Sequence, residues 1–143
     1  MKTKEFQWAP LVPELVCSDL VESKGFYIGI VGARLEYERP GFAYLSIGNA
    51  QIMLEQEPSE WVTGGLEAPY GRGVNFQIEV DNVEKLAARL SDAAVPLFRE
   101  LRDEWYSANG IEHGQREFLV QDPDGYLLRF NSVIGNRIAG EAT

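Results

Sequence analysis

The chain has 143 residues, of which 45% are hydrophobic, and its 22 acidic and 13 basic residues give a net charge of −9. A length of this order predicts one globular domain with an ordinary hydrophobic core. The excess of acid argues against binding to nucleic acid, which needs clustered Lys and Arg, and is compatible with a cationic partner. No apolar run approaches the roughly 20 residues that span a bilayer, so no membrane partner is predicted.

Cysteine usage and the N-terminal sequence bear on location. Cys17 is the only cysteine, so no internal disulfide is expected. The lysines near the N-terminus are not followed by an apolar block, unlike those of a secretion signal. Together these features favour the cytoplasm.

The first half of the chain reads as a strand, a helix and three further strands. Leu11–Cys17 is a short apolar run that predicts a strand. Asp19 is predicted to cap a helix that ends near Gly29 and Gly32. The three strands that follow are expected at residues 33–38, 42–47 and 51–56, with turns between them.

The same order recurs in the second half. Val74–Val80 alternates between apolar and polar side chains, which predicts a strand, and Asp81 is predicted to cap a helix running to about Ala93. Three more strands are expected at residues 95–101, 116–121 and 126–130, the last two joined by a turn at 122–125. The tetrapeptides beginning at Asp19 and Asp81 match at an offset of 62 residues, as in a duplicated unit.

We therefore predict an α+β fold in which two βαβββ modules form a curved, cup-shaped mixed sheet with the helices outside. The single domain would span residues 1–143, with modules at about 10–57 and 73–132. Residues 58–72 would connect them, and residues 133–143 would form a C-terminal tail. The inner face of such a cup is the natural place for a ligand.

Three features together resemble the vicinal oxygen chelate superfamily. They are the element order, the capped segment Asp19–Ser23 followed by Phe26-Tyr27, and the segment Asp122–Tyr126 near the end. That superfamily contains glyoxalase I, ring-cleaving dioxygenases, fosfomycin-resistance enzymes and bleomycin-resistance proteins. The resemblance covers roughly residues 10–132.

Metal enzymes of the superfamily place His, Gln or Glu ligands at four positions on the inner strand faces. Carried onto this chain, the four positions are Val12, Met53 (or Glu55, if the register shifts by two), Asn75 and Arg129. At most one of them is a good ligand, and Arg129 would repel a divalent ion. The resemblance thus predicts neither a metal nor another cofactor here.

Arg129 stands where the metal-binding carboxylate would be. By strand alternation it shares a face with Asn131 and points away from the helix side. Two roles stay open and are compatible: an ion pair across the cup, or contact with a ligand. The candidate acids for the ion pair are Glu14, Glu55 and Glu79.

Members of the superfamily that have lost the metal resemble bleomycin-resistance proteins, acidic dimers that sequester a large cationic glycopeptide at the subunit interface. Gly114–Phe118 matches their Gly-x-Arg-Glu-Phe pattern. His113 departs from it, because many relatives have a Trp there, packed against the drug. The resemblance implies antibiotic resistance, a homodimer and a cationic or aromatic small-molecule ligand. It leaves open whether the modules pair within one chain or between two.

Aromatic side chains are candidates for a surface on which a planar cation stacks. Phe42 and Tyr44 alternate onto the predicted inner face, whereas Trp61 and Trp105 lie in loop-like contexts and would bind ligand or seal a dimer interface. The full predicted set of ligand-binding residues is Phe42, Tyr44, Met53, Glu55, Trp61, Asn75, Trp105, His113 and Arg129.

The sequence favours a binding protein over an enzyme. None of the serines has a paired histidine in a recognisable arrangement, and Cys17 falls on the helix side of its strand, so no catalytic residue is predicted. Two alternatives remain. One is a metal-dependent glyoxalase-like or dioxygenase-like lyase with atypical ligands, Glu55 among them. The other is a regulatory domain that binds a metabolite.

Overall fold

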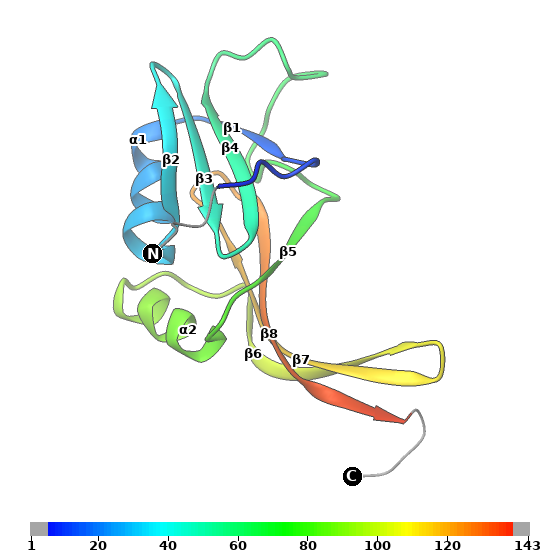
Figure 1. Cartoon of the computed structure of the whole chain (residues 1–143). Coiled ribbons are helices and arrows are strands. Elements are labelled where there is room, and N and C mark those ends of the chain that lie inside the picture. Colours follow the sequence, from blue (N-terminus) through cyan, green and yellow to red (C-terminus); the bar gives the residue numbers. More distant parts are fainter. Residues whose placement is uncertain (1–5, 139–143) are drawn as a thin grey trace, which may run out of the picture.

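The computed structural model describes residues 6–138 as two four-stranded sheets, each with a helix on one face (Figure 1). The N-terminal half contains β1 (Glu14–Cys17), α1 (Leu20–Lys24), η1 (Gly25–Val31), β2 (Arg34–Arg39), β3 (Phe42–Ile47) and β4 (Ala50–Gln56). The C-terminal half contains β5 (Asn75–Glu79), α2 (Val83–Asp92), β6 (Arg99–Ala108), β7 (Ile111–Gln121) and β8 (Leu127–Ile138). The predicted α+β fold with two βαβββ units is confirmed.

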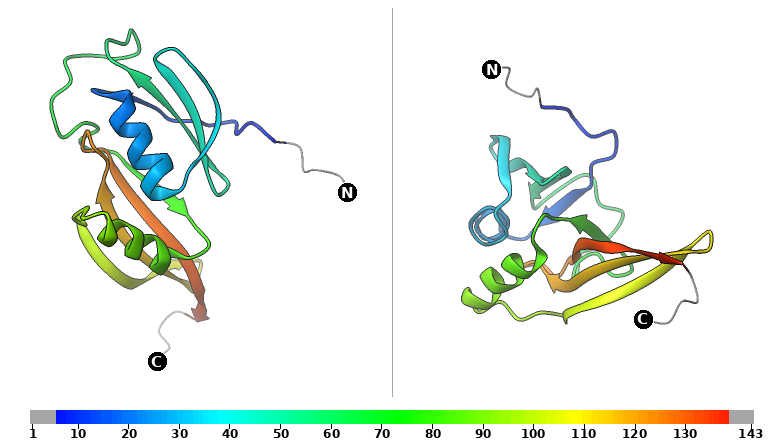
Figure 2. Two further views of the ribbon diagram at one scale, coloured as in Figure 1. Left: turned by 90° about the vertical axis from the view of Figure 1, so that its left-hand side faces the viewer. Right: turned by 60° about the horizontal axis from the view of Figure 1, so that its bottom comes forward.

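Both sheets have the same strand pattern. The N-terminal sheet has the order β1-β4-β3-β2 and the C-terminal sheet the order β5-β8-β7-β6. In each sheet the first strand runs parallel to its neighbour and the other pairs are antiparallel. Figures 1 and 2 show α1, η1 and α2 gathered on one side, while the β6–β7 hairpin projects away from them. Within residues 6–138, no helix is long and apolar enough to cross a membrane.

The helix ends follow from local chemistry. Asp19 caps α1 as predicted, because its carboxylate accepts the backbone N–H groups of the second and third residues after it. Gly32 ends η1 with φ 90°, a conformation that favours glycine. The predicted cap of the second helix is wrong by one residue: Asn82, not Asp81, accepts the N–H of Lys85.

Three strands of the C-terminal sheet, β6, β7 and β8, are longer than predicted, whereas β5 is one residue shorter at each end than the predicted Val74–Val80. β6 begins at Arg99 rather than at residue 95 and runs on to Ala108, and β7 begins at Ile111. β8 continues to Ile138, so residues 133–138 of the predicted tail are strand. Most side chains in these extensions are exposed. The extensions are strands because their backbones pair with the neighbouring strands, not because their side chains are buried. The apolar periodicity that marks a half-buried strand is therefore missing there.

One hydrophobic core lies between the helix sides of the two sheets. Strand alternation places Leu128 and Phe130 in this core and Arg129 on the opposite face, as predicted. Both halves contribute large buried side chains, among them Tyr27, Leu45, Leu54, Leu90, Phe118, Leu128 and Phe130. The halves thus pack through their helix sides, which leaves the other face of each sheet turned away from the core.

A buried carboxylate fastens the two halves together. The Asp122 Oδ1 atom accepts the backbone N–H groups of Asp124, Gly125 and Tyr126. Its Oδ2 accepts the hydroxyl of Tyr27, from the other half, at 2.7 Å. Burial raises the pKa of Asp122, although these donors favour its charged form.

The same turn makes two further contacts across the halves. The Asp124 carboxylate accepts both the backbone N–H and the hydroxyl of Ser18. The Tyr126 hydroxyl donates to the Val16 carbonyl at 3.0 Å. Gly125 is required at the tip, because a Cβ there would lie 2.5 Å from Pro69. The turn between β7 and β8 therefore contacts both the C-terminal end of β1 and the connection between the two halves, at Pro69.

Replacing Tyr27 with Phe tests this attachment. The ring would still fill its site, but one oxygen of the buried Asp122 would lose its donor, so we expect the free energy of unfolding to fall by about 1–3 kcal/mol. Urea denaturation measures the change. The matched control is Tyr37→Phe, on an exposed ring, where the loss should stay below about 0.5 kcal/mol. Equal losses in the two variants would contradict the role of Tyr27.

Candidate functional site

The face of each sheet that is turned away from the helices, here called its far face, carries the polar and aromatic side chains. The far face of the N-terminal sheet is defined by Glu14, Val16, Phe42, Tyr44, Gln51, Met53 and Glu55. The far face of the C-terminal sheet is defined by Asn75, Gln77, Tyr106, Gln115, Glu117, Leu119, Arg129 and Asn131.

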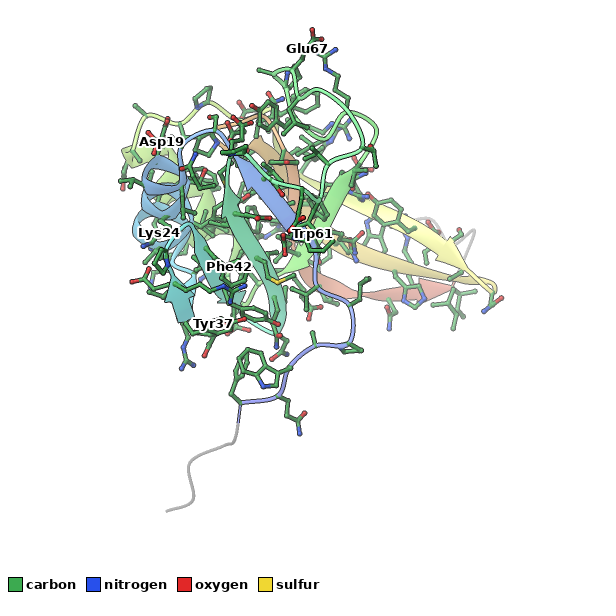
Figure 3. The ribbon with its side chains drawn as sticks, turned by 90° about the horizontal axis from the view of Figure 1, so that it is seen from above. Asp19, Lys24, Tyr37, Phe42, Trp61 and Glu67 are labelled. Carbon is green, nitrogen blue, oxygen red and sulfur yellow. The ribbon has the colours of Figure 1, made fainter. Side chains whose placement is uncertain are left out.

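Strand register brings four of the predicted ligand-binding residues together on the N-terminal far face. Tyr44 lies opposite Met53, and Phe42 lies opposite Glu55. Both aromatic rings are largely buried. The Arg39 guanidinium carbon lies 3.8 Å from the centre of the Phe42 ring, so this ring already serves as a cation–π platform. Figure 3 shows Phe42 and Tyr37 near each other on this sheet.

Glu14 and Glu55 form a coupled pair of carboxyl groups at the edge of this aromatic surface. A hydrogen bond with Glu55, burial and the charge of Glu55 together raise the pKa of Glu14 to about 7, against the opposing effect of Arg39. The Ser59 hydroxyl donates to Glu55 at 2.9 Å. Near neutral pH the Glu14 carboxyl therefore still holds a proton in part, which a bound cation could displace. From the sequence, Glu14 was predicted only as a candidate partner of Arg129, and its place beside Glu55 was missed.

A buried carboxylate organises the C-terminal far face. Glu117 is 1% exposed; it accepts the Tyr106 hydroxyl at 2.6 Å and lies 3.4 Å from the Arg129 guanidinium. Arg129, whose side chain is 25% exposed, also donates to Asn75 at 3.3 Å. Burial, and then the hydrogen bond to Glu117, raise the pKa of Tyr106. Arg129, Asn75, Tyr106 and Glu117 thus form one connected network.

The acid that pairs with Arg129 is therefore not one of the three predicted candidates, Glu14, Glu55 and Glu79. Arg129 lies directly opposite Leu119, which makes Glu117 its diagonal neighbour on the adjacent strand. Glu14 and Glu55 belong to the other sheet. The predicted ion pair of Arg129 thus exists with a different partner, and its contact with a ligand stays a prediction.

Two buried polar atoms on the same far face lack partners within residues 6–138. They are the Asn131 amide nitrogen and the Gln115 side-chain oxygen. Asn131 lies opposite Glu117, and Gln115 is two residues before Glu117 on β7. Buried polar groups are normally hydrogen-bonded, so a ligand or another chain is a natural source of the missing partners.

The three remaining predicted residues are Trp61, Trp105 and His113. Trp61 is 72% exposed in the connection between the halves, where Figure 3 marks it. Trp105 is on the opposite face of β6 from Tyr106; it packs on Gly114 beneath the Arg137 guanidinium at 4.0 Å. His113 is exposed on the C-terminal far face, opposite Tyr106, with its Nδ1 atom 2.9 Å from the Asn136 side-chain oxygen. Their contact with a ligand stays a prediction.

Among the positions that correspond to metal ligands, only Glu55, the alternative to Met53, offers a carboxylate to a divalent ion. Val12 and Met53 supply no oxygen or nitrogen, and Asn75 is hydrogen-bonded to the cationic Arg129. Within residues 6–138, no three His, Cys, Asp or Glu side chains are grouped as a metal site would require. The chemistry available on the far faces is charge pairing, hydrogen bonding and aromatic stacking.

Comparison with known proteins agrees with the fold. Residues 10–130 match the family model of the glyoxalase/bleomycin resistance protein/dioxygenase superfamily. The chain belongs to this superfamily. A bleomycin resistance protein from Geobacillus stearothermophilus is 26% identical over 129 residues, which cover 83% of this chain and 92% of that protein.

Solved structures of similar fold include two with TM-scores well above 0.5. TioX from Micromonospora sp. ML1 has a TM-score of 0.69 at 20% identity, and the match covers 87% of this chain and 98% of that one. Virulence protein STM3117 from Salmonella typhimurium has a TM-score of 0.65 at 16% identity, with 94% and 100% covered. At these identities the likeness concerns the fold alone.

The carboxyl pair predicts a pH dependence of stability. The pKa of Glu14 is about 7 in the folded chain and 4.5 at its ordinary value, so the folded state binds more protons between these pH values. Stability should therefore fall as the pH rises from about 4.5 to 7. In Glu14→Gln the loss of stability should be smaller by about 1 kcal/mol. This value is lower than the pKa shift alone would give, because solvent screens the partly exposed Glu14 and Glu55. Thermal unfolding at pH 5 and pH 8 measures this loss of stability. The exposed Glu67→Gln is the control. Identical pH profiles in the wild type and both variants would contradict the raised pKa of Glu14.

Replacing Arg129 with Met should leave the buried Glu117 carboxylate without its counter-charge. We expect the free energy of unfolding to fall by about 2 kcal/mol, less than for a fully buried pair because Arg129 is partly exposed. Adding Glu117→Gln should restore part of the loss. Lys24→Met, which breaks the surface pair with Glu38, should cost under about 1 kcal/mol. If the double variant is no more stable than Arg129→Met, the pair does not act as described.

Proposed function

We propose that this protein sequesters a cationic or aromatic small molecule without using a metal, in the manner of a bleomycin-resistance protein. The observation that carries the proposal is the Glu14–Glu55 carboxyl pair beside the Phe42 and Tyr44 rings. A cationic group can replace the proton held by Glu14, and Arg39 on the Phe42 ring shows that a planar cation can stack there. The net charge of −9 further favours a cation as ligand.

Sequence similarity supports the same class of ligand. The matched relative from Geobacillus stearothermophilus bears the name bleomycin resistance protein, and the match covers most of both chains. Metal independence is supported by Arg129, which occupies the position of a ligand carboxylate and is paired with Glu117. The composition and the single buried cysteine are in keeping with action in the cytoplasm.

A second copy of the chain is part of the proposal. The two halves share a core through their helix sides, so their far faces are turned away from it. We propose that the N-terminal far face of one copy meets the C-terminal far face of another, which encloses the ligand between them. Exposed apolar side chains on the C-terminal sheet, such as Val133, favour such contact.

Isothermal titration with a bleomycin-type compound tests the proposal. Wild-type protein should bind it with or without a chelator, and Glu55→Gln should weaken binding about tenfold, as expected for the loss of one charge contact. The exposed Glu67→Gln should bind as the wild type does. A sensitive host expressing the gene should be protected. No binding and no protection across a panel of such compounds would contradict the proposal.

A metal-dependent enzyme is the second candidate, because Glu14 and Glu55 bring two carboxyl groups together and the superfamily includes glyoxalases and dioxygenases. Elemental analysis of protein purified without chelator separates the two. A stoichiometric divalent metal that disappears in Glu55→Gln would favour the enzyme and count against sequestration.

A further inference from the structure

A segment near the N-terminus, residues 6–10, lies over one end of the N-terminal sheet and is here called the strap. A single side chain, Gln51, fastens it. The Gln51 amide oxygen accepts the backbone N–H of Ala9 at 2.8 Å, and its amide nitrogen donates to the Gln7 carbonyl at 2.7 Å. The Tyr44 hydroxyl donates to the same Gln51 oxygen at 2.5 Å. The backbone of the strap is thus hydrogen-bonded to a side chain of the sheet rather than to its backbone.

Aromatic rings line the underside of the strap. The Trp8 ring meets Tyr44 edge-on with centroids 4.9 Å apart, and Tyr37 at 5.6 Å. Phe6 packs against Trp8 at 4.5 Å. Trp8 nevertheless remains 60% exposed. Part of its surface is therefore free for another group, which is unusual for so large an apolar side chain.

A cavity of about 440 Å³ lies between the strap and strands β2, β3 and β4. Phe6 and Trp8 line it from the strap, and Glu36, Ser46 and Asn49 line it from the sheet. The Glu36 side chain is 13% exposed and accepts the Ser46 hydroxyl at 2.8 Å. Its nearest cation, Arg34, is 3.7 Å away and 82% exposed, so solvent weakens that pairing.

We propose that this cavity is a second binding site, which takes a small organic cation consisting of an ammonium group on an aromatic or alkyl body. A carboxylate withdrawn from water with a weak counter-charge favours a cation, and the Trp8 ring can contact that cation or its apolar body. The site is separate from the Glu14–Glu55 pair. Glu36 bonds Ser46 near one end of β3, whereas Glu55 lies opposite Phe42 at the other. It does not depend on the proposed function.

Benzyltrimethylammonium is a suitable probe, with benzyl alcohol as its neutral counterpart. Nuclear magnetic resonance titration should show saturable shifts of the Trp8 indole N–H with the cation, and binding at least tenfold weaker with the alcohol. Glu36→Gln should weaken cation binding about tenfold. Glu38→Gln is the matched control, because Glu38 lies on the same strand but is exposed and pairs with Lys24; it should bind as the wild type does.

Unchanged affinity in a folded Glu36→Gln, or no saturable shift at Trp8, would overturn the proposal. The amide spectrum of each variant shows whether it is folded. Should Glu36→Gln fail to fold, Trp8→Leu on the exposed strap decides instead: at least threefold weaker binding supports the site, and wild-type affinity overturns it. Glu55→Gln should leave the affinity read from the Trp8 shift unchanged, which separates this site from the one proposed for sequestration.

Discussion

The carboxylate of Asp122 determines how the two halves of this chain meet. It accepts three backbone N–H groups of its own turn and the hydroxyl of Tyr27 from the other half. Leaving a buried carboxylate without donors is costly, so arrangements of the two halves that separate Asp122 from Tyr27 are disfavoured. It holds the β7–β8 turn against the N-terminal helix. The helix sides of the two sheets then share one core, and the far faces are directed outwards.

The two far faces differ in charge and in chemistry. The N-terminal face combines aromatic rings with two neighbouring carboxyl groups, of which Glu14 has a raised pKa. The C-terminal face has a guanidinium bound to a buried carboxylate and leaves two buried polar atoms without partners in the described chain. The carboxyl groups of one face and the unmet hydrogen-bonding capacity of the other make the faces complementary, so joining them across two copies is physically reasonable.

Much of the fold could be predicted because its signals are local. Alternation placed Leu128 and Phe130 in the core and Arg129 outside it, and the turn at 122–125 was marked by its Pro and Gly. The duplicated order of elements gave the two βαβββ units. The extensions of β6, β7 and β8 were missed, because their mostly exposed side chains carry no apolar periodicity.

The site was predicted less completely, because its contacts depend on register between strands that are distant in sequence. Glu117 is the partner of Arg129 because the β7–β8 register places Leu119 opposite Arg129 and Glu117 diagonally beside it. That register could not be read from the sequence alone. The Glu14–Glu55 pair needs the parallel pairing of β1 with β4. The strap was missed because the Gln51 side chain, rather than a strand ladder, holds it in place.

The central claim, that one cleft is built from two copies, is tested by mixing chains. Glu55→Gln alters only the N-terminal far face and Arg129→Met only the C-terminal one. A dimer containing one chain of each variant would have one cleft with both changes and one with neither. Titration of purified mixed dimers should therefore show one site per dimer with wild-type affinity. A monomeric protein, or mixed dimers without any wild-type site, would contradict the account.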